Sequence, residues 1–152
     1  MSETSGEVWF YHLERATLEQ VLPELLEKTL ARGWRALVRS GDAEQRARLD
    51  AWLWTYRDES FLPHGAAGEA AADRQPILLT DGDENTNGAQ ALFVLDEAPA
   101  DISAYARTIL IFDGHDEAAL ARARDYWKSY KTAKLEVAYW KQGETRGWER
   151  QG

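Results

Sequence analysis

Two clusters of aromatic and charged residues carry the best-defined chemistry of this sequence, and both suit binding rather than catalysis. The first cluster places four large aromatic residues within ten positions, at Trp52, Trp54, Tyr56 and Phe61. On a helix, Trp54 points about 160° away from Tyr56, so the two rings cannot easily pack against one sheet. Because Trp and Tyr favour interface hot spots, one aromatic face is predicted to contact a partner. The alternative is that all four rings pack the following loop onto the core.

The second cluster lies in a segment, 117–134, whose periodicity predicts a long helix. Arg124, Lys128 and Lys131 recur at spacings of four and three residues and form one stripe, with Trp127 about 60° to one side. A basic stripe beside an aromatic ring can bind an acidic peptide that carries an apolar anchor, with arginine holding a carboxylate. The alternative is a solvated face whose cations stabilise the end of the helix.

Sequence motifs for catalysis, metal binding and nucleotide binding are missing. The segment that follows the first expected strand, 13–17, has no glycine, and no phosphate-binding loop motif occurs anywhere. The three histidines, His12, His64 and His115, are isolated in sequence, and the chain has no cysteine. We therefore expect no catalytic residue, no metal and no cofactor.

Hydrophobic patterning predicts an α/β fold with a mostly parallel sheet and crossover helices. Helices are expected after Thr17, after Ser40 or Asp42, and after the turn 113–116. A long irregular stretch is expected over 57–74. One domain is expected over 1–142, and a polar, frayed tail over 143–152. The expected strands cover residues 8–13, 34–39, 77–80, 91–95, 108–112 and 137–140.

Length and charge restrict the class of protein. The 152 residues suit one domain, and the formal net charge of −8 disfavours a protein that coats DNA, because phosphates must be neutralised by cations. No signal-peptide pattern and no apolar run approaching the ~20 residues of a membrane span are visible. The lack of cysteine fits a reducing compartment, so a cytoplasmic location is expected.

Across both clusters the sequence resembles the chi subunit family of bacterial DNA polymerase III holoenzyme. The resemblance runs from Phe10 to Lys141, and the order and spacing of its landmarks make it specific. The landmarks are the segments 49–54, 59–64, 75–77, 92–95, 123–124 and 128–131. The resemblance implies a single three-layer, Rossmann-like domain without a nucleotide-binding loop.

The same resemblance implies an adaptor in DNA replication that is not an enzyme by itself, although its holoenzyme is a DNA-directed DNA polymerase, a nucleotidyltransferase. Chi subunits pair with the psi subunit and so attach to the clamp loader. They also bind the acidic C-terminal tail of the single-stranded DNA-binding protein, which ends in Phe. DNA is then reached only indirectly, at the replisome, with no membrane and no small-molecule substrate.

Residue by residue, the resemblance places Trp54 and Phe61 at the surface that faces psi, with Pro63 and His64 shaping the same loop.

At the second cluster, the resemblance places Arg124 at the tail's terminal carboxylate and Lys128 at its aspartates, and Lys131 extends the stripe. Trp127 stands where the family often has Tyr, and Asp113 stands where an apolar pocket residue is expected.

The sequence is also compatible with two other functions. One is direct binding of single-stranded DNA through Trp127, Tyr130 and the basic stripe. The other is direct binding of a nucleotide, which requires a phosphate-binding loop that the sequence does not show.

Overall fold

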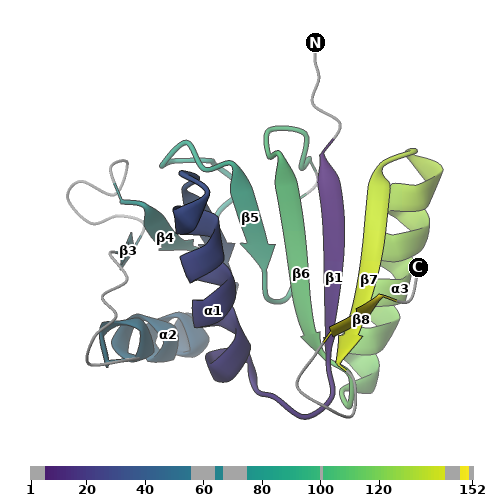
Figure 1. The fold of residues 1–152 in the computed structure, drawn as a ribbon, viewed down its shortest axis with the longest axis horizontal. Coiled ribbons are helices and arrows are strands. Elements are labelled where there is room, and N and C mark those ends of the chain that lie inside the picture. The colour runs from purple at the N-terminus through teal and green to yellow at the C-terminus, as the bar shows by residue number, and fades with distance from the viewer. Residues whose placement is uncertain (1–5, 56–63, 67–74, 100, 143–147, 151–152) are drawn as a thin grey trace.

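A computed structural model describes residues 6–55, 64–66, 75–99, 101–142 and 148–150. Strands and helices alternate along most of this length, as the hydrophobic pattern predicts (Figure 1). The elements are β1 (Glu7–Leu13), α1 (Leu18–Ala31), β2 (Ala36–Arg39), α2 (Ala43–Thr55), β3 (His64–Ala66), β4 (Ile77–Thr80), β5 (Ala91–Val94), β6 (Arg107–Asp113), α3 (Glu117–Thr132), β7 (Glu136–Gln142) and β8 (Trp148–Arg150).

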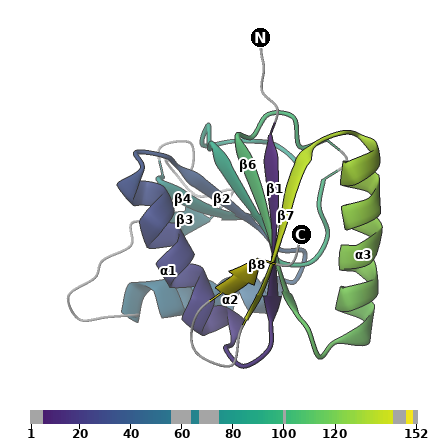
Figure 2. The ribbon, with the colours of Figure 1, turned by 45° about the vertical axis from the view of Figure 1, so that its right-hand side comes forward.

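The strands form one eight-stranded sheet in the order β3-β4-β2-β5-β6-β1-β7-β8. All pairs from β3 to β7 are parallel, and only β8 is antiparallel, against β7. Helices α1 and α2 cover one face and α3 covers the other (Figure 2). The structure therefore confirms the expected three-layer, Rossmann-like α/β fold with a mostly parallel sheet.

The local sequence explains where α1 begins and ends. Thr17 and Gln20 form a capping box in which each side chain accepts a hydrogen bond from the backbone N–H of the other. Leu22 and Leu26, one turn apart, are fully buried against the sheet. Gly33 follows the helix with φ of 82°, a left-handed conformation that glycine adopts without a steric penalty.

Helix α3 packs against the sheet mainly through aromatic rings. The Asp116 carboxylate accepts hydrogen bonds from the N–H groups of Ala118 and Ala119 and caps the helix. Ala123 is its one fully buried residue, while Trp127 and Tyr130 are half-buried against β1 and β7. Because wide rings cover the sheet, the polar side chains of α3 remain at the surface.

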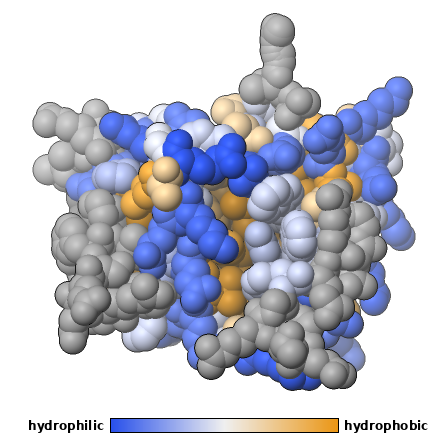
Figure 3. Space-filling model, viewed as in Figure 1, coloured by the Kyte–Doolittle hydropathy of each residue, from blue (hydrophilic) through white to orange (hydrophobic). Residues whose placement is uncertain are grey.

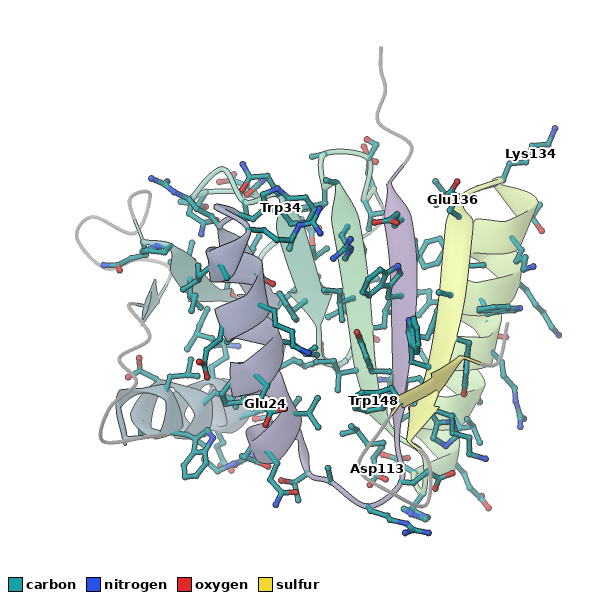
Figure 4. All side chains as sticks on the ribbon, viewed as in Figure 1. Glu24, Trp34, Asp113, Lys134, Glu136 and Trp148 are labelled. Atoms are coloured by element: carbon teal, nitrogen blue, oxygen red, sulfur yellow. The ribbon has the colours of Figure 1, made fainter. Side chains whose placement is uncertain are left out.

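Two short strands lie in segments that the sequence analysis expected to lack them. β3 falls within the stretch expected to be irregular and pairs with β4, with His64 opposite Ile77. β8 falls within the tail expected to be frayed, and its Trp148 ring packs edge-on against Tyr11 at 4.9 Å (Figure 4). Three residues are too few to show strand periodicity, and these strands depend on pairing with a neighbour.

The α1 face of the sheet is only partly covered by helices. Beside α1, a narrow apolar strip reaches the surface (Figure 3). Over β1 and β7 the cover consists of aromatic side chains, with Trp9 packed against Trp140 at 6.1 Å and Arg107 over the Trp9 ring at 3.8 Å. None of the described helices is long and apolar enough to cross a membrane.

Candidate protein-binding site

A hollow of about 300 Å³ opens between α3 and β7 and is lined by Arg124, Trp127, Lys128 and Tyr139. We call it the α3–β7 hollow. Three of its four residues belong to the stripe and aromatic position that the sequence analysis selected. The fourth, Tyr139, comes from the strand on the far side of the hollow.

The sheet order brings these residues together. β1 lies between β6 and β7, so α3 must cross over β1 on its way from one to the other. Phe10 of β1 is fully buried beneath the crossing, stacked on Tyr139 at 6.0 Å and edge-on to Trp127 at 5.5 Å. Trp127 and Tyr139 also contact each other edge-on, at 5.7 Å. The floor of the hollow is therefore a fixed aromatic surface.

The rim of the hollow is cationic. Arg124 and Lys128 are exposed, and neither side chain forms a hydrogen bond or ion pair with another residue of the described chain. Lys131 stands over the Trp127 ring, with its Nζ 5.2 Å from the ring centre. Exposed cations beside an apolar floor suit a ligand that combines carboxylates with an apolar group.

The rings near this hollow do not form an open stacking surface. Tyr130 is stacked on Tyr126 at 5.8 Å and packs against Phe10 at 6.4 Å. Burial, with Tyr126 as a smaller contribution, raises the pKa of Tyr130 to about 12. Tyr130 is half-buried and already stacks on another ring of α3, so less of its face is free for a base.

Of the residues expected to face psi, only two are described, and one of them belongs to β3 at the opposite edge of the sheet. Trp54 lies in α2 and His64 opens β3, but Phe61 and Pro63 are outside the described residues. The Trp52 indole N–H donates to the Glu19 carbonyl of α1 at 2.6 Å. The Trp52 side chain therefore links α2 to α1. The prediction that Trp54, Phe61, Pro63 and His64 meet a partner remains a prediction.

A second, larger cavity of about 580 Å³ lies at the carboxyl ends of the strands, where folds of this class often bind nucleotides. We call it the carboxyl-edge cleft. Five carboxylates line it against two arginines. The charged lining residues are Glu14, Asp42, Asp96, Asp113, Asp116, Arg15 and Arg122. A phosphate group in this cleft would face repulsion from the carboxylates.

The helix N-termini at the carboxyl-edge cleft are already capped by the chain itself. Asp42 accepts from the N–H groups of Glu44 and Gln45 at the start of α2. The Asp116 carboxylate likewise accepts from backbone N–H groups at the start of α3, and the Thr17 side chain accepts from one at the start of α1. The N–H groups that hold phosphate in nucleotide-binding folds are therefore occupied by side chains.

Asp113, expected near an apolar pocket, lies at this carboxyl end of β6 (Figure 4) and not in the α3–β7 hollow. Its carboxylate accepts from the N–H of His115.

Comparison with known proteins shows the family of this chain. The protein has an α/β fold without a recognisable nucleotide-binding loop in its sequence, and a hollow that combines a cationic rim with an aromatic floor. The family model "DNA polymerase III chi subunit, HolC" matches residues 6–138, so the chain belongs to the chi subunit family of DNA polymerase III.

Individual relatives carry the same description. DNA polymerase III subunit chi of Escherichia coli is 28% identical over 142 residues, which cover 87% of this chain and 97% of that protein. The Pseudomonas aeruginosa subunit is 32% identical over 114 residues, which cover 74% of this chain and 78% of that protein. A probable chi subunit of Rickettsia prowazekii is 30% identical over 93 residues, covering 61% of this chain and 55% of that protein.

Proposed function

We propose that this protein is a non-catalytic adaptor of the DNA polymerase III holoenzyme, active at the replisome in the cytoplasm. One surface binds the acidic C-terminal tail of the single-stranded DNA-binding protein, and another binds the psi subunit of the clamp loader. Family membership supports the replication role. The observation that carries the tail site is the exposed pair Arg124 and Lys128 on the rim of a hollow with an aromatic floor.

The tail would enter the α3–β7 hollow with its terminal Phe against Trp127 and Tyr139. Burying such a ring is worth roughly 1.5–3 kcal/mol. Arg124 offers a planar guanidinium to the terminal carboxylate, and Lys128 and Lys131 meet acidic residues further along the tail. Because these charged contacts would be exposed to solvent, salt should screen and weaken them.

The test is a titration of the full chain with a short acidic peptide that ends in Pro-Phe. Binding is monitored by Trp fluorescence or calorimetry at two salt concentrations. We expect binding that weakens as salt rises, because exposed charge pairs are screened. A matched peptide that ends in Pro-Ala keeps the charges and should bind more weakly. Equal affinity for the two peptides, or no binding of either, would reject the tail site. A bare oligonucleotide in parallel separates this function from direct binding of single-stranded DNA.

The psi surface rests on the resemblance and on the place of β3 at the other edge of the sheet. Phe61→Ala should weaken co-purification with psi and leave the affinity for the acidic peptide unchanged. Arg124→Ala should have the opposite pattern. If either variant weakened both interactions while remaining folded, the two surfaces would not be separate.

A further inference from the structure

A chain of polar contacts centred on the buried His12 runs from Tyr139 to Glu14. Tyr139 is one of the residues that line the hollow, and its hydroxyl is 2.7 Å from Nδ1 of His12. Nε2 of His12 is 3.2 Å from a carboxylate oxygen of Glu14. His12 itself is buried, with 8% of its surface exposed. The floor of the hollow is thus connected through one imidazole to a charged group at the end of β1.

Only one neutral form of His12 satisfies both neighbours. If Nε2 carries the proton, it donates to Glu14, and Nδ1 accepts from the Tyr139 O–H group. The other tautomer would point an Nε2 lone pair at a carboxylate. Burial raises the pKa of Tyr139, so this hydroxyl keeps its proton and can donate.

The surroundings hold the His12 ring in place. A Cβ on Gly114 would collide with the ring, so only glycine fits beside it. Phe112 of β6 packs against the ring at 5.2 Å. The residue therefore has little freedom to rotate away from Tyr139.

Three further charged or titratable groups lie near the two neighbours of His12. Lys141 of β7 lies 3.3 Å from Glu14, and His115, in the turn before α3, lies 3.4 Å from the same carboxylate. The positive charge of Arg124, on α3, acts to lower the pKa of Tyr139, against the effect of burial.

The pKa of the imidazole follows from these surroundings. Burial lowers the pKa of His12, and Glu14 acts against this by favouring the charged ring. The net result is a pKa below the usual value of histidine, which favours the neutral ring.

Building on the proposed binding of an acidic tail, we propose that His12 is a positioning residue that sets the polarity of the Tyr139 hydroxyl toward the ligand. With neutral His12, the hydroxyl proton points away from the hollow and its oxygen lone pairs face the ligand. With protonated His12, Nδ1–H donates to the Tyr139 oxygen, and the hydroxyl proton must turn toward the hollow. The hydroxyl then donates to a ligand carboxylate, and a positive charge lies behind it.

This arrangement predicts that affinity for an acidic ligand rises as the pH falls through the pKa of His12. One hydrogen bond to a charged group corresponds to a gain of about tenfold. The ligand's own carboxylates stay ionised above about pH 5, so they do not cause the change.

The experiment uses the full chain and the acidic peptide that ends in Pro-Phe. The pKa of His12 is first measured from its ring protons by NMR, and the dissociation constant is then measured one pH unit above and below it. We expect about tenfold tighter binding at the lower pH for the wild type. His12→Gln can still hydrogen-bond but cannot titrate, and should bind with no such pH dependence. The matched control is His115→Gln, which removes another histidine beside Glu14 and should keep most of the wild-type dependence.

Tyr139→Phe keeps the ring and removes the hydroxyl, so it tests the same inference if His12→Gln does not fold. It should bind the peptide without the tenfold change. Wild-type pH dependence in either variant would overturn the inference and leave the proposed tail site intact. A wild-type protein that binds no peptide at either pH would overturn both.

Discussion

The α3–β7 hollow and the carboxyl-edge cleft differ in a way that size does not reveal. The cleft is about twice as large, at about 580 Å³ against about 300 Å³. Its carboxylates, however, are used to cap helices and hold turns, so its polar groups serve the fold. Two cations on the rim of the smaller hollow, Arg124 and Lys128, form no hydrogen bond or ion pair with another described residue. For this reason we place the proposed tail site in the smaller hollow and not in the larger cleft.

The largest expected effect is the loss of the rim arginine. Arg124→Ala should weaken binding of the acidic peptide about 10- to 100-fold, because it removes a charge-assisted bond to carboxylate worth roughly 1.5–3 kcal/mol. Calorimetry at low salt measures this. The matched control is Lys28→Ala, which removes the same charge from an exposed position on α1, on the other face of the sheet. A similar loss in both variants would mean that only net charge matters.

The next effect concerns the carboxyl-edge cleft. Asp116→Ala removes the cap of α3 and should lower the free energy of unfolding by about 1 kcal/mol, while peptide affinity changes by less than about twofold. Urea unfolding and the peptide titration together check this. Asp116→Asn retains a capping side chain and should recover most of the stability. If the Asp116→Ala variant is fully folded and still loses most of its affinity for the peptide, the cleft takes part in binding.

A pH-dependent effect on stability is expected from His12, which contacts Tyr139 of the hollow and Glu14 of the cleft. Its pKa is lowered by burial in the folded state, so the unfolded chain binds the proton more readily. Stability should therefore fall as pH decreases from about 6.5 toward the folded pKa, with a slope of at most about 1.4 kcal/mol per pH unit from this group. Comparison of the unfolding free energies of wild type and His12→Gln across this window isolates it. Parallel curves would contradict the prediction.

The smallest effect is expected at the end of α3. Lys134 has φ of 65°, a left-handed conformation that glycine adopts more readily. Lys134→Gly should stabilise the protein by about 0.5 kcal/mol and weaken peptide binding by less than about twofold. Lys134 lies at the other end of α3 from Asp113 and is not among the residues that line the hollow (Figure 4). A Tm below that of the wild type would show that the lysine side chain matters more than its backbone.

Periodicity predicted the long elements because each has enough residues to show its buried face. The apolar run from Val8 to Leu13 and the Thr17–Gln20 capping box correspond to β1 and the start of α1. The three-residue strands β3 and β8 were missed for the opposite reason. Nothing in three residues distinguishes a strand from a turn until a neighbouring strand supplies hydrogen bonds.

The sequence by itself determined the α/β class, the basic stripe of α3 and its neighbouring ring, because all of these depend on residues close together in the chain. Only the tertiary structure decided that β7 lies beside β1, which places Tyr139 opposite Arg124 and against His12, 127 residues away. Alternation along a strand defines two faces but does not say what covers each. That depends on the order of strands in the sheet, which long-range packing sets.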